Sequence, residues 1–162
     1  MAHLHRRPAV VLMLAAAMVG GVACSNHSEV SNSIRGLLFT KKKKTIRLAE
    51  VTKFTWDEAY MFNPYTPRSE VCKKLHIQQS DCERRVPFES KSDGEMSIAF
   101  LVGGSLVHYA SHGRGRGDFT PLPALPLSPH NAIFSVVQDD ISNAPDPWIK
   151  LVLISEQVRD NL

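Results

Sequence analysis

The sequence lacks the short motifs that mark several large enzyme classes. It contains no glycine-rich P-loop, no G-x-G-x-x-G dinucleotide fingerprint and no H-E-x-x-H metal motif. It also lacks the G-x-S-x-G turn that presents a nucleophilic serine, since Ser105 follows Gly103-Gly104 in a stretch that reads as a hairpin. The motifs therefore give no reason to assign a nucleotide-dependent, zinc-dependent or serine-dependent reaction.

A hydrophobic run long enough to cross a membrane is also missing. The apolar run from Ala9 to Val19 is shorter than the about 20 residues that a transmembrane helix needs. Arg6 and Arg7 precede this run, and small residues at positions 20–23 follow it. This order is typical of a secretory signal peptide, so we expect residues 1–23 to be a leader that is removed.

The end of this leader resembles a lipid-attachment site. Gly21-Val22-Ala23-Cys24 is similar to the lipobox of bacterial lipoproteins, although Gly21 stands where that motif usually has Leu. The resemblance implies that signal peptidase II cuts before Cys24 and that its thiol and the new N-terminus are acylated, with palmitate among the chains. Several acyl chains anchor a protein stably to a membrane. Ordinary secretion, with cleavage nearby and a cysteine here by chance, is the alternative.

The residue after the cysteine indicates where in the cell envelope the protein is sorted. This residue is Ser25. In Gram-negative members of the lipoprotein class, a residue other than Asp at this position implies sorting to the outer membrane. We therefore expect a protein of the cell envelope, anchored by lipid on the periplasmic face of the outer membrane.

Cysteine is scarce, with three in the chain. An odd number in an exported protein needs an explanation, and lipid on Cys24 would leave Cys72 and Cys82 as one pair. An oxidising periplasm permits their disulfide, which would stabilise the fold by roughly 3 kcal/mol in the chain-entropy model. The alternative is a metal site, but His76 is the nearest further ligand and nothing completes a set. We expect the disulfide, and neither a metal nor another cofactor.

An excess of charge of one sign is absent from the mature chain. The whole sequence has 19 basic and 16 acidic residues, and the leader holds two arginines and no acid. The mature chain thus has 17 basic and 16 acidic residues, which leaves no footprint for a nucleic-acid partner. One basic run remains, Lys41 to Lys44. It predicts either attraction to anionic lipid or, in the interpretation that we favour here, a solvated linker.

Hydrophobic patterning predicts one folded unit. We expect residues 24–44 to form a polar and basic tether and residues 45–162 to form a single α+β domain. One N-terminal helix would pack on a four- to five-stranded, mostly antiparallel sheet. The expected elements are a strand at 58–62, a helix from Thr66-Pro67 to about residue 76, a hairpin turning at Gly103-Gly104, and strands within 131–138 and 147–155, the last one central.

Part of this pattern resembles small bacterial exported proteins and lipoproteins whose activity is not known. The resemblance rests on "FTWDEAYMFNPYTP" and the following "VC", residues 54–72, with a "DGE" turn and a hairpin further on. It implies a single domain and carries no activity.

Candidate catalytic groups are sparse. Asp57 and Glu58 are adjacent, so a strand would direct them to opposite faces and they would not form a carboxylate pair. His108 and His112 would share a face but lie about 13 Å apart on a strand, too far to share one metal. We expect no catalytic residue from this reasoning.

Candidate partner-binding residues are aromatic or arginine side chains, which are enriched at interaction hot spots. They are Trp56, Tyr60, Tyr65, Arg114, Arg116 and Phe119. Aromatic residues also fill cores, so burial is the alternative for each. The sequence thus predicts a lipid-anchored envelope protein that binds a protein partner without catalysis, as an assembly accessory or an inhibitor or immunity protein. An envelope hydrolase with unrecognised catalytic residues is the alternative.

Overall fold

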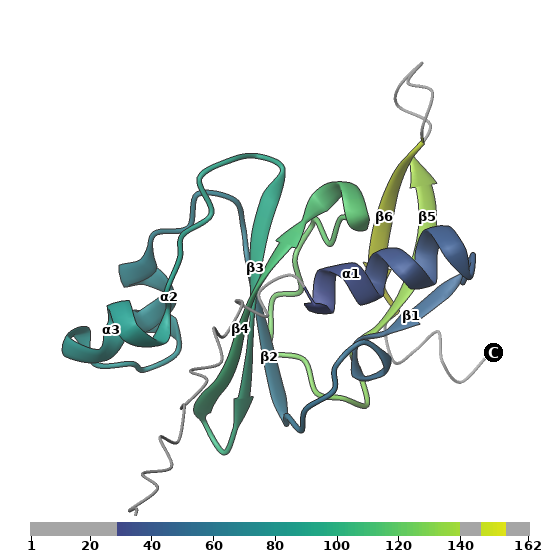
Figure 1. Ribbon diagram of the computed structural model, residues 1–162. Helices are drawn as coiled ribbons and strands as arrows, with labels where there is room; N and C mark the ends of the chain where they lie inside the picture. Colours follow the sequence, from purple (N-terminus) through teal and green to yellow (C-terminus); the bar gives the residue numbers. More distant parts are fainter. Residues whose placement is uncertain (1–28, 140–146, 155–162) are drawn as a thin grey trace, which may run out of the picture.

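The computed structural model describes residues 29–139 and 147–154. These residues form an α+β fold of short helices and two antiparallel three-stranded sheets (Figure 1). The helices are α1 (Glu29–Arg35), α2 (Arg68–Lys74) and α3 (Gln79–Arg85), and the strands are β1 (Thr45–Arg47), β2 (Glu58–Phe62), β3 (Glu95–Val102), β4 (Ser105–Gly113), β5 (Ile133–Asp139) and β6 (Trp148–Leu153). A π-helical turn, Gly36–Thr40, continues α1. No helix within these ranges is long and apolar enough to span a membrane.

The strands divide between two sheets rather than forming one. One sheet has the order β1-β5-β6 and the other the order β2-β3-β4. The α+β class and the antiparallel pairing are confirmed, whereas the expected single sheet under one helix is not what forms. The division follows from β3, which is apolar enough to be buried on both faces.

The β2-β3-β4 sheet lies in the middle of the molecule. Met96, Ile98 and Phe100 point from β3 into the larger core cluster, which α1 and the β1-β5-β6 sheet complete. Ala99 and Leu101 point to the other face, where α2 and α3 cover them (Figure 1). Because β3 is buried on both of its faces, covering elements are needed on both sides of the sheet.

The hairpin and the strand before it form where the sequence predicts them. β2 spans the expected residues, and β3 and β4 join at Gly103 and Gly104, whose φ angles of 54° and 75° suit a tight hairpin turn. Asp57 Oδ2 accepts a hydrogen bond from the Gly103 amide at 2.7 Å and braces this turn. The acid next to Glu58 is therefore a local cap.

The last two strands are confirmed, but their order differs from the prediction. β5 is central and β6 lies at the end of its sheet. The free edge of β6 is partly covered, since the Asp118 amide donates to the Ile149 carbonyl at 2.8 Å and the Leu151 amide donates to the Asp118 carbonyl at 2.7 Å. The inner face of β6 places Leu151 in the core with Ile149 and Leu153 packed beside it, whereas Trp148 and Val152 on the other face are exposed.

Cys72 and Cys82 form the expected disulfide, with Cα atoms 5.8 Å apart. The predicted helix begins one residue late, because Pro67 rather than Thr66 occupies the N-cap. Cys82 lies on a second helix, α3, which the sequence pattern did not predict. The disulfide thus joins two short helices that cover one face of the middle sheet.

The segment expected to be a tether is part of the fold where the structure describes it. Residues 29–40 are helical and bury Val30, Ile34 and Leu38 in the larger core cluster. Gly117 makes this close packing possible, since a Cβ there would lie 2.8 Å from a Leu38 methyl. The folded part therefore begins before residue 45. Cys24 lies outside the described residues.

Replacement of Ile34 by Ala should destabilise the protein, because this fully buried side chain ties α1 to the core. We expect a loss of about 3 kcal/mol in the free energy of unfolding, measured by urea titration with tryptophan fluorescence. The neighbouring exposed Arg35→Ala change is the control and should cost less than about 0.5 kcal/mol. Equal, small effects of both changes would show that α1 does not belong to the core.

Candidate functional site

Arg114 forms a structural ion pair instead of an exposed binding group. The Asp118 side chain is 1 % exposed, and its carboxylate accepts hydrogen bonds from Arg114 Nε at 3.0 Å and Nη2 at 2.8 Å. Thr120 Oγ1 and Trp148 Nε1 donate to the same carboxylate at 2.8 and 2.9 Å. This cluster joins the loop after β4 to β6, so Arg114 acts within the fold.

The hydrogen bonds also set the charge state of Asp118. Burial by itself would raise its pKa, but the bonds from Arg114, Trp148 and Thr120 outweigh burial and lower the pKa to about 2. The same bond raises the pKa of Arg114. Both groups of the pair are therefore charged at neutral pH.

His112 is buried and neutral. Its Nε2 donates to the Gly117 carbonyl at 2.6 Å, and its ring packs against Phe119. Burial lowers the pKa of His112 to about 4, although the bond to Gly117 acts in the opposite direction. His108 stacks on Phe54 with ring centroids 4.5 Å apart. Both rings thus serve packing, and the described residues hold no group of three His, Cys, Asp or Glu side chains placed for a metal.

Two of the aromatic candidates are core residues. Trp56 is buried against Phe100, and its Nε1 donates to Thr52 Oγ1 at 3.0 Å. Phe119 is buried against Phe134. Neither ring is available to a partner. Both rings therefore fill the core, which is the alternative that the sequence left open for each of them.

Arg116 lies at the surface beside α1 and donates a hydrogen bond to Asn32 Oδ1. Its partly exposed guanidinium holds the loop against the helix. The position leaves Arg116 away from the two remaining candidates, Tyr60 and Tyr65, so the structure does not bring the six predicted binding residues into one site.

Tyr60 lies in a groove beside β2, which we call the β2 groove. The groove has a volume of about 710 Å³ and is lined by residues 60–62 of β2 and the following Asn63, by α2 with Lys73 and Lys74, and by the loop 122–125. Lys74 Nζ lies 5.8 Å from the centroid of the Tyr60 ring. Leu125, which lines the groove, is 78 % exposed, and Tyr65, next to the lining residue Thr66, is 57 % exposed.

The backbone of β2 is partly open toward this groove. Ala59 exchanges both backbone hydrogen bonds with Leu127, at 2.7 and 2.9 Å, on the edge that faces away from β3. Alternate residues of a strand direct their backbone groups to the same edge, so Met61 directs its N–H and C=O toward the groove. An extended chain placed there could continue the pairing that Leu127 begins.

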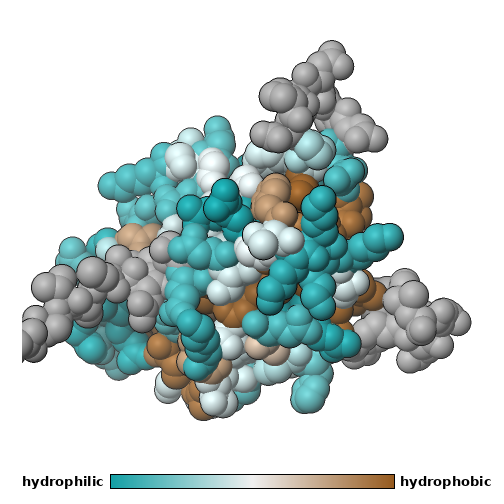
Figure 2. Space-filling model, turned by 45° about the vertical axis from the view of Figure 1, so that its right-hand side comes forward, coloured by the Kyte–Doolittle hydropathy of each residue, from teal (hydrophilic) through white to brown (hydrophobic). Residues whose placement is uncertain are grey.

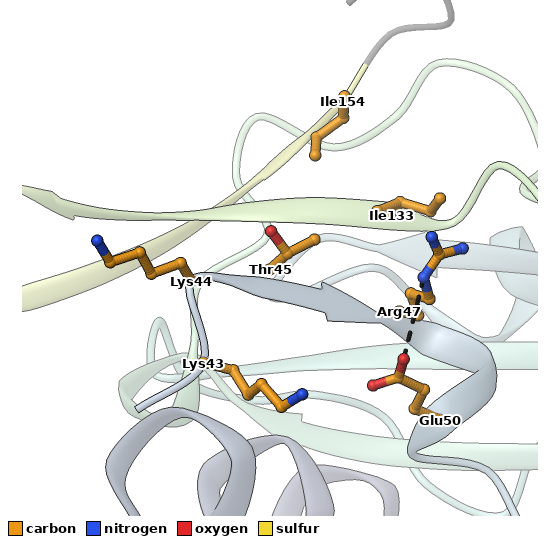
Figure 3. A pocket seen from close by; sticks show the side chains of 7 residues that line it. All are labelled: Lys43, Lys44, Thr45, Arg47, Glu50, Ile133 and Ile154. Atoms are coloured by element: carbon orange, nitrogen blue, oxygen red, sulfur yellow. Dashed lines mark ion pairs between the residues drawn. The ribbon is translucent and has the colours of Figure 1, made fainter. Parts of the chain in front are cut away.

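A second pocket adjoins the basic run. It has a volume of about 630 Å³ and is lined by Lys43, Lys44 and Arg47 together with Ile133 and Ile154. Figure 3 shows the two lysine side chains leaving the chain in different directions, while Arg47 pairs with Glu50 at 3.9 Å. Because these cationic groups do not converge on one point, the pocket is not a cradle for a single small anion.

The chain matches no model of a known protein family. No significant similarity to a curated protein or to a solved structure was found either. Functional inference therefore rests on the residues and surfaces described above.

Sequence reasoning missed most of the β2 groove. Lys73, Lys74 and Leu125 are unremarkable in sequence, since lysines on a short helix and a leucine among prolines are common. One signal was available: the prolines at 121–129 favour an extended chain, and Leu127 in this stretch pairs with β2. What remained hidden is that the preceding residues leave a hollow beside the strand.

Acid should destabilise the protein in two separate ranges of pH. The ordinary pKa of 6.5 for His112 falls to about 4 in the fold, so the unfolded chain takes up this proton first and stability falls between about pH 6.5 and 4. The pKa of Asp118 falls from 3.8 to about 2, so its stabilising effect is present above about pH 4 and is lost toward pH 2.

Urea titrations across pH test this assignment. His112→Gln should flatten the slope of stability between about pH 6.5 and 4 and leave the lower range unchanged. Asp118→Asn should flatten the lower range and cost about 2 kcal/mol at neutral pH, because it weakens hydrogen bonds to a charged group. An unchanged slope in the upper range for His112→Gln would contradict the buried, neutral histidine.

Proposed function

We propose that the protein is a lipid-anchored cell-envelope module that binds a protein partner and has no catalytic activity of its own. Lipid on Cys24 would hold it on the periplasmic face of the outer membrane. An assembly accessory and an inhibitor or immunity protein both fit this description. The partner would be a protein, not a nucleic acid.

The observation that carries this proposal is the β2 groove with Leu125 and Tyr65 exposed at or near it. Exposed aromatic and aliphatic side chains beside a hollow are a common arrangement at protein interfaces. Leu125 lines the groove with Tyr65 close by in the sequence, Tyr60 lies in the groove, and the backbone N–H and C=O of Met61 point toward it. A partner segment could therefore gain apolar contacts and strand pairing together.

The proposed location in the cell envelope is supported by two independent features of the chain. The lipobox-like residues before Cys24 favour export with lipidation, and the Cys72–Cys82 disulfide is compatible with an oxidising compartment. For the hydrolase alternative, His112 would not serve as the general base, because its Nε2 is bonded to the Gly117 carbonyl in the buried core.

The lipid anchor is tested by metabolic labelling with palmitate in cells that export lipoproteins. The unaltered chain should take up label and fractionate with the envelope. Cys24→Ala should take up none, because the acylated thiol is removed. Cys72→Ala leaves the lipobox intact and serves as the control, which should still be labelled. An unlabelled parent chain would remove the basis for the anchor.

The partner site is tested by replacing Tyr65 with a photo-crosslinking phenylalanine analogue in intact cells. We expect a reproducible adduct with one envelope protein, identified by mass spectrometry. The same analogue at Val107, which is 49 % exposed on β4, is the matched control and should give no such adduct. The same adduct from both positions, or none from Tyr65, would argue against the β2 groove as the interface.

A further inference from the structure

The structure points to a second interaction surface, on the side of α1. We propose that Arg35, Phe39 and the turn Lys41–Lys44, here called the basic face, dock directly on an anionic lipid bilayer. This inference rests on the proposed function in one respect, since lipid on Cys24 would bring the basic face to the membrane.

The basic face is a fixed part of the fold, not a mobile linker. The Lys41 amide donates to the Gly36 carbonyl and the Lys43 amide to the Leu37 carbonyl, both at 3.0 Å. The Lys44 carbonyl accepts from the Val136 amide of β5 at 2.9 Å. These bonds hold the backbone of the turn between the end of the helix and the sheet, so the four lysines extend from a fixed segment of the surface.

The charge of the basic face is not neutralised within the described part of the chain. All four lysines are exposed, and none takes part in an ion pair among the described residues. The nearest acids in the sequence have other partners: Glu29 pairs with Lys53, and Glu50 pairs with Arg47. The surplus positive charge is therefore available to an external partner of negative charge.

An apolar group accompanies these charges. α1 buries Val30, Ile34 and Leu38 toward the core, which leaves Arg35 and Phe39 on the outward side. Phe39 is 45 % exposed. Figure 2, which turns the right-hand side of Figure 1 toward the viewer, shows hydrophilic groups over this side with hydrophobic groups between them. Basic residues with an exposed aromatic ring are typical of helices that lie in a membrane interface.

A bilayer fits the basic face better than a single small anion does. The amines of Lys43 and Lys44 extend in different directions (Figure 3), so they are spread for many headgroups instead of converging on one. The chain from Cys24 to Glu29 spans at most about 18 Å when fully extended. The helix of residues 29–40 adds about 18 Å more. A lipid anchor at one end and the basic face at the other can therefore both touch one membrane.

This orientation leaves the β2 groove accessible. α2, which lines the groove, lies on the opposite side of the β2-β3-β4 sheet from α1 (Figure 1). With the basic face on the bilayer, α2 and Leu125 would face the periplasm. The anchor and the fold would then act together to present the groove to a partner.

The test uses the full chain, isolated from membranes and placed in vesicles of phosphatidylcholine alone or of phosphatidylcholine with phosphatidylglycerol. A membrane-impermeant amine reagent labels exposed lysines, and mass spectrometry gives the rate at each. We expect Lys41–Lys44 to react at least about fivefold more slowly on the anionic vesicles, the effect of a single basic residue held near a charged surface. Lys73 and Lys91, exposed elsewhere, should react equally on both.

Matched variants locate the effect. Lys41→Gln with Lys43→Gln should restore fast labelling of Lys42 and Lys44 on anionic vesicles, whereas Lys73→Gln with Lys91→Gln should not. Raising the salt concentration should also restore it, because screening shortens the range of surface charge. Equal labelling of Lys41–Lys44 on both kinds of vesicle, or protection that both pairs of variants remove alike, would overturn the proposal.

Flotation of the chain with neutral vesicles distinguishes a failure of this proposal from a failure of the proposed lipid anchor. A chain that floats with phosphatidylcholine vesicles but shows no protected lysines keeps its anchor and refutes the basic face. A chain that does not float with neutral vesicles, yet is protected on anionic ones, refutes the anchor and supports the basic face.

Discussion

Burial of the β2-β3-β4 sheet on both faces is the constraint on which the rest of the structure depends. From Met96 to Leu101, successive β3 side chains on either face are excluded from water. Such a sheet is stable only when each face has its own cover. The smaller cover is α2 with α3, which are too short to hold their relative position without the Cys72–Cys82 disulfide. The larger cover is α1 with the β1-β5-β6 sheet.

The same constraint explains why polar groups in the core are tightly paired. The loop after β4 runs from the middle sheet to β6. Asp118 holds it there, because its backbone is hydrogen-bonded to β6 and its carboxylate forms an ion pair with Arg114. A buried carboxylate is tolerated because Arg114, Thr120 and Trp148 satisfy it. The polar groups of these residues are therefore used within the fold. The groups left for recognition lie on the outside, in the β2 groove and on the basic face.

These two surfaces suggest two separate binding roles, one toward a membrane and one toward a protein. One side of the molecule carries exposed lysines and an exposed aromatic ring, which suit a charged lipid surface. The other carries a groove beside β2 with Leu125 and Tyr65 exposed at or near it, which suits a polypeptide. Because the middle sheet and its covers separate the surfaces, a membrane and a partner protein could be bound at the same time. The fold would then act as a spacer of fixed geometry.

The sequence by itself determined the local elements: β2, the hairpin at Gly103-Gly104, the helix after Pro67 and the Cys72–Cys82 pair follow from turn chemistry, strand periodicity and cysteine counting. Only the tertiary structure decided that the strands form two sheets, that α1 belongs to the core, and which candidates are exposed. Trp56 and Phe119 are buried while Tyr65 is not, and no local pattern separates them. An aromatic ring favours burial in a core and contact with a partner for the same physical reason, so the packing of distant segments has to choose between them.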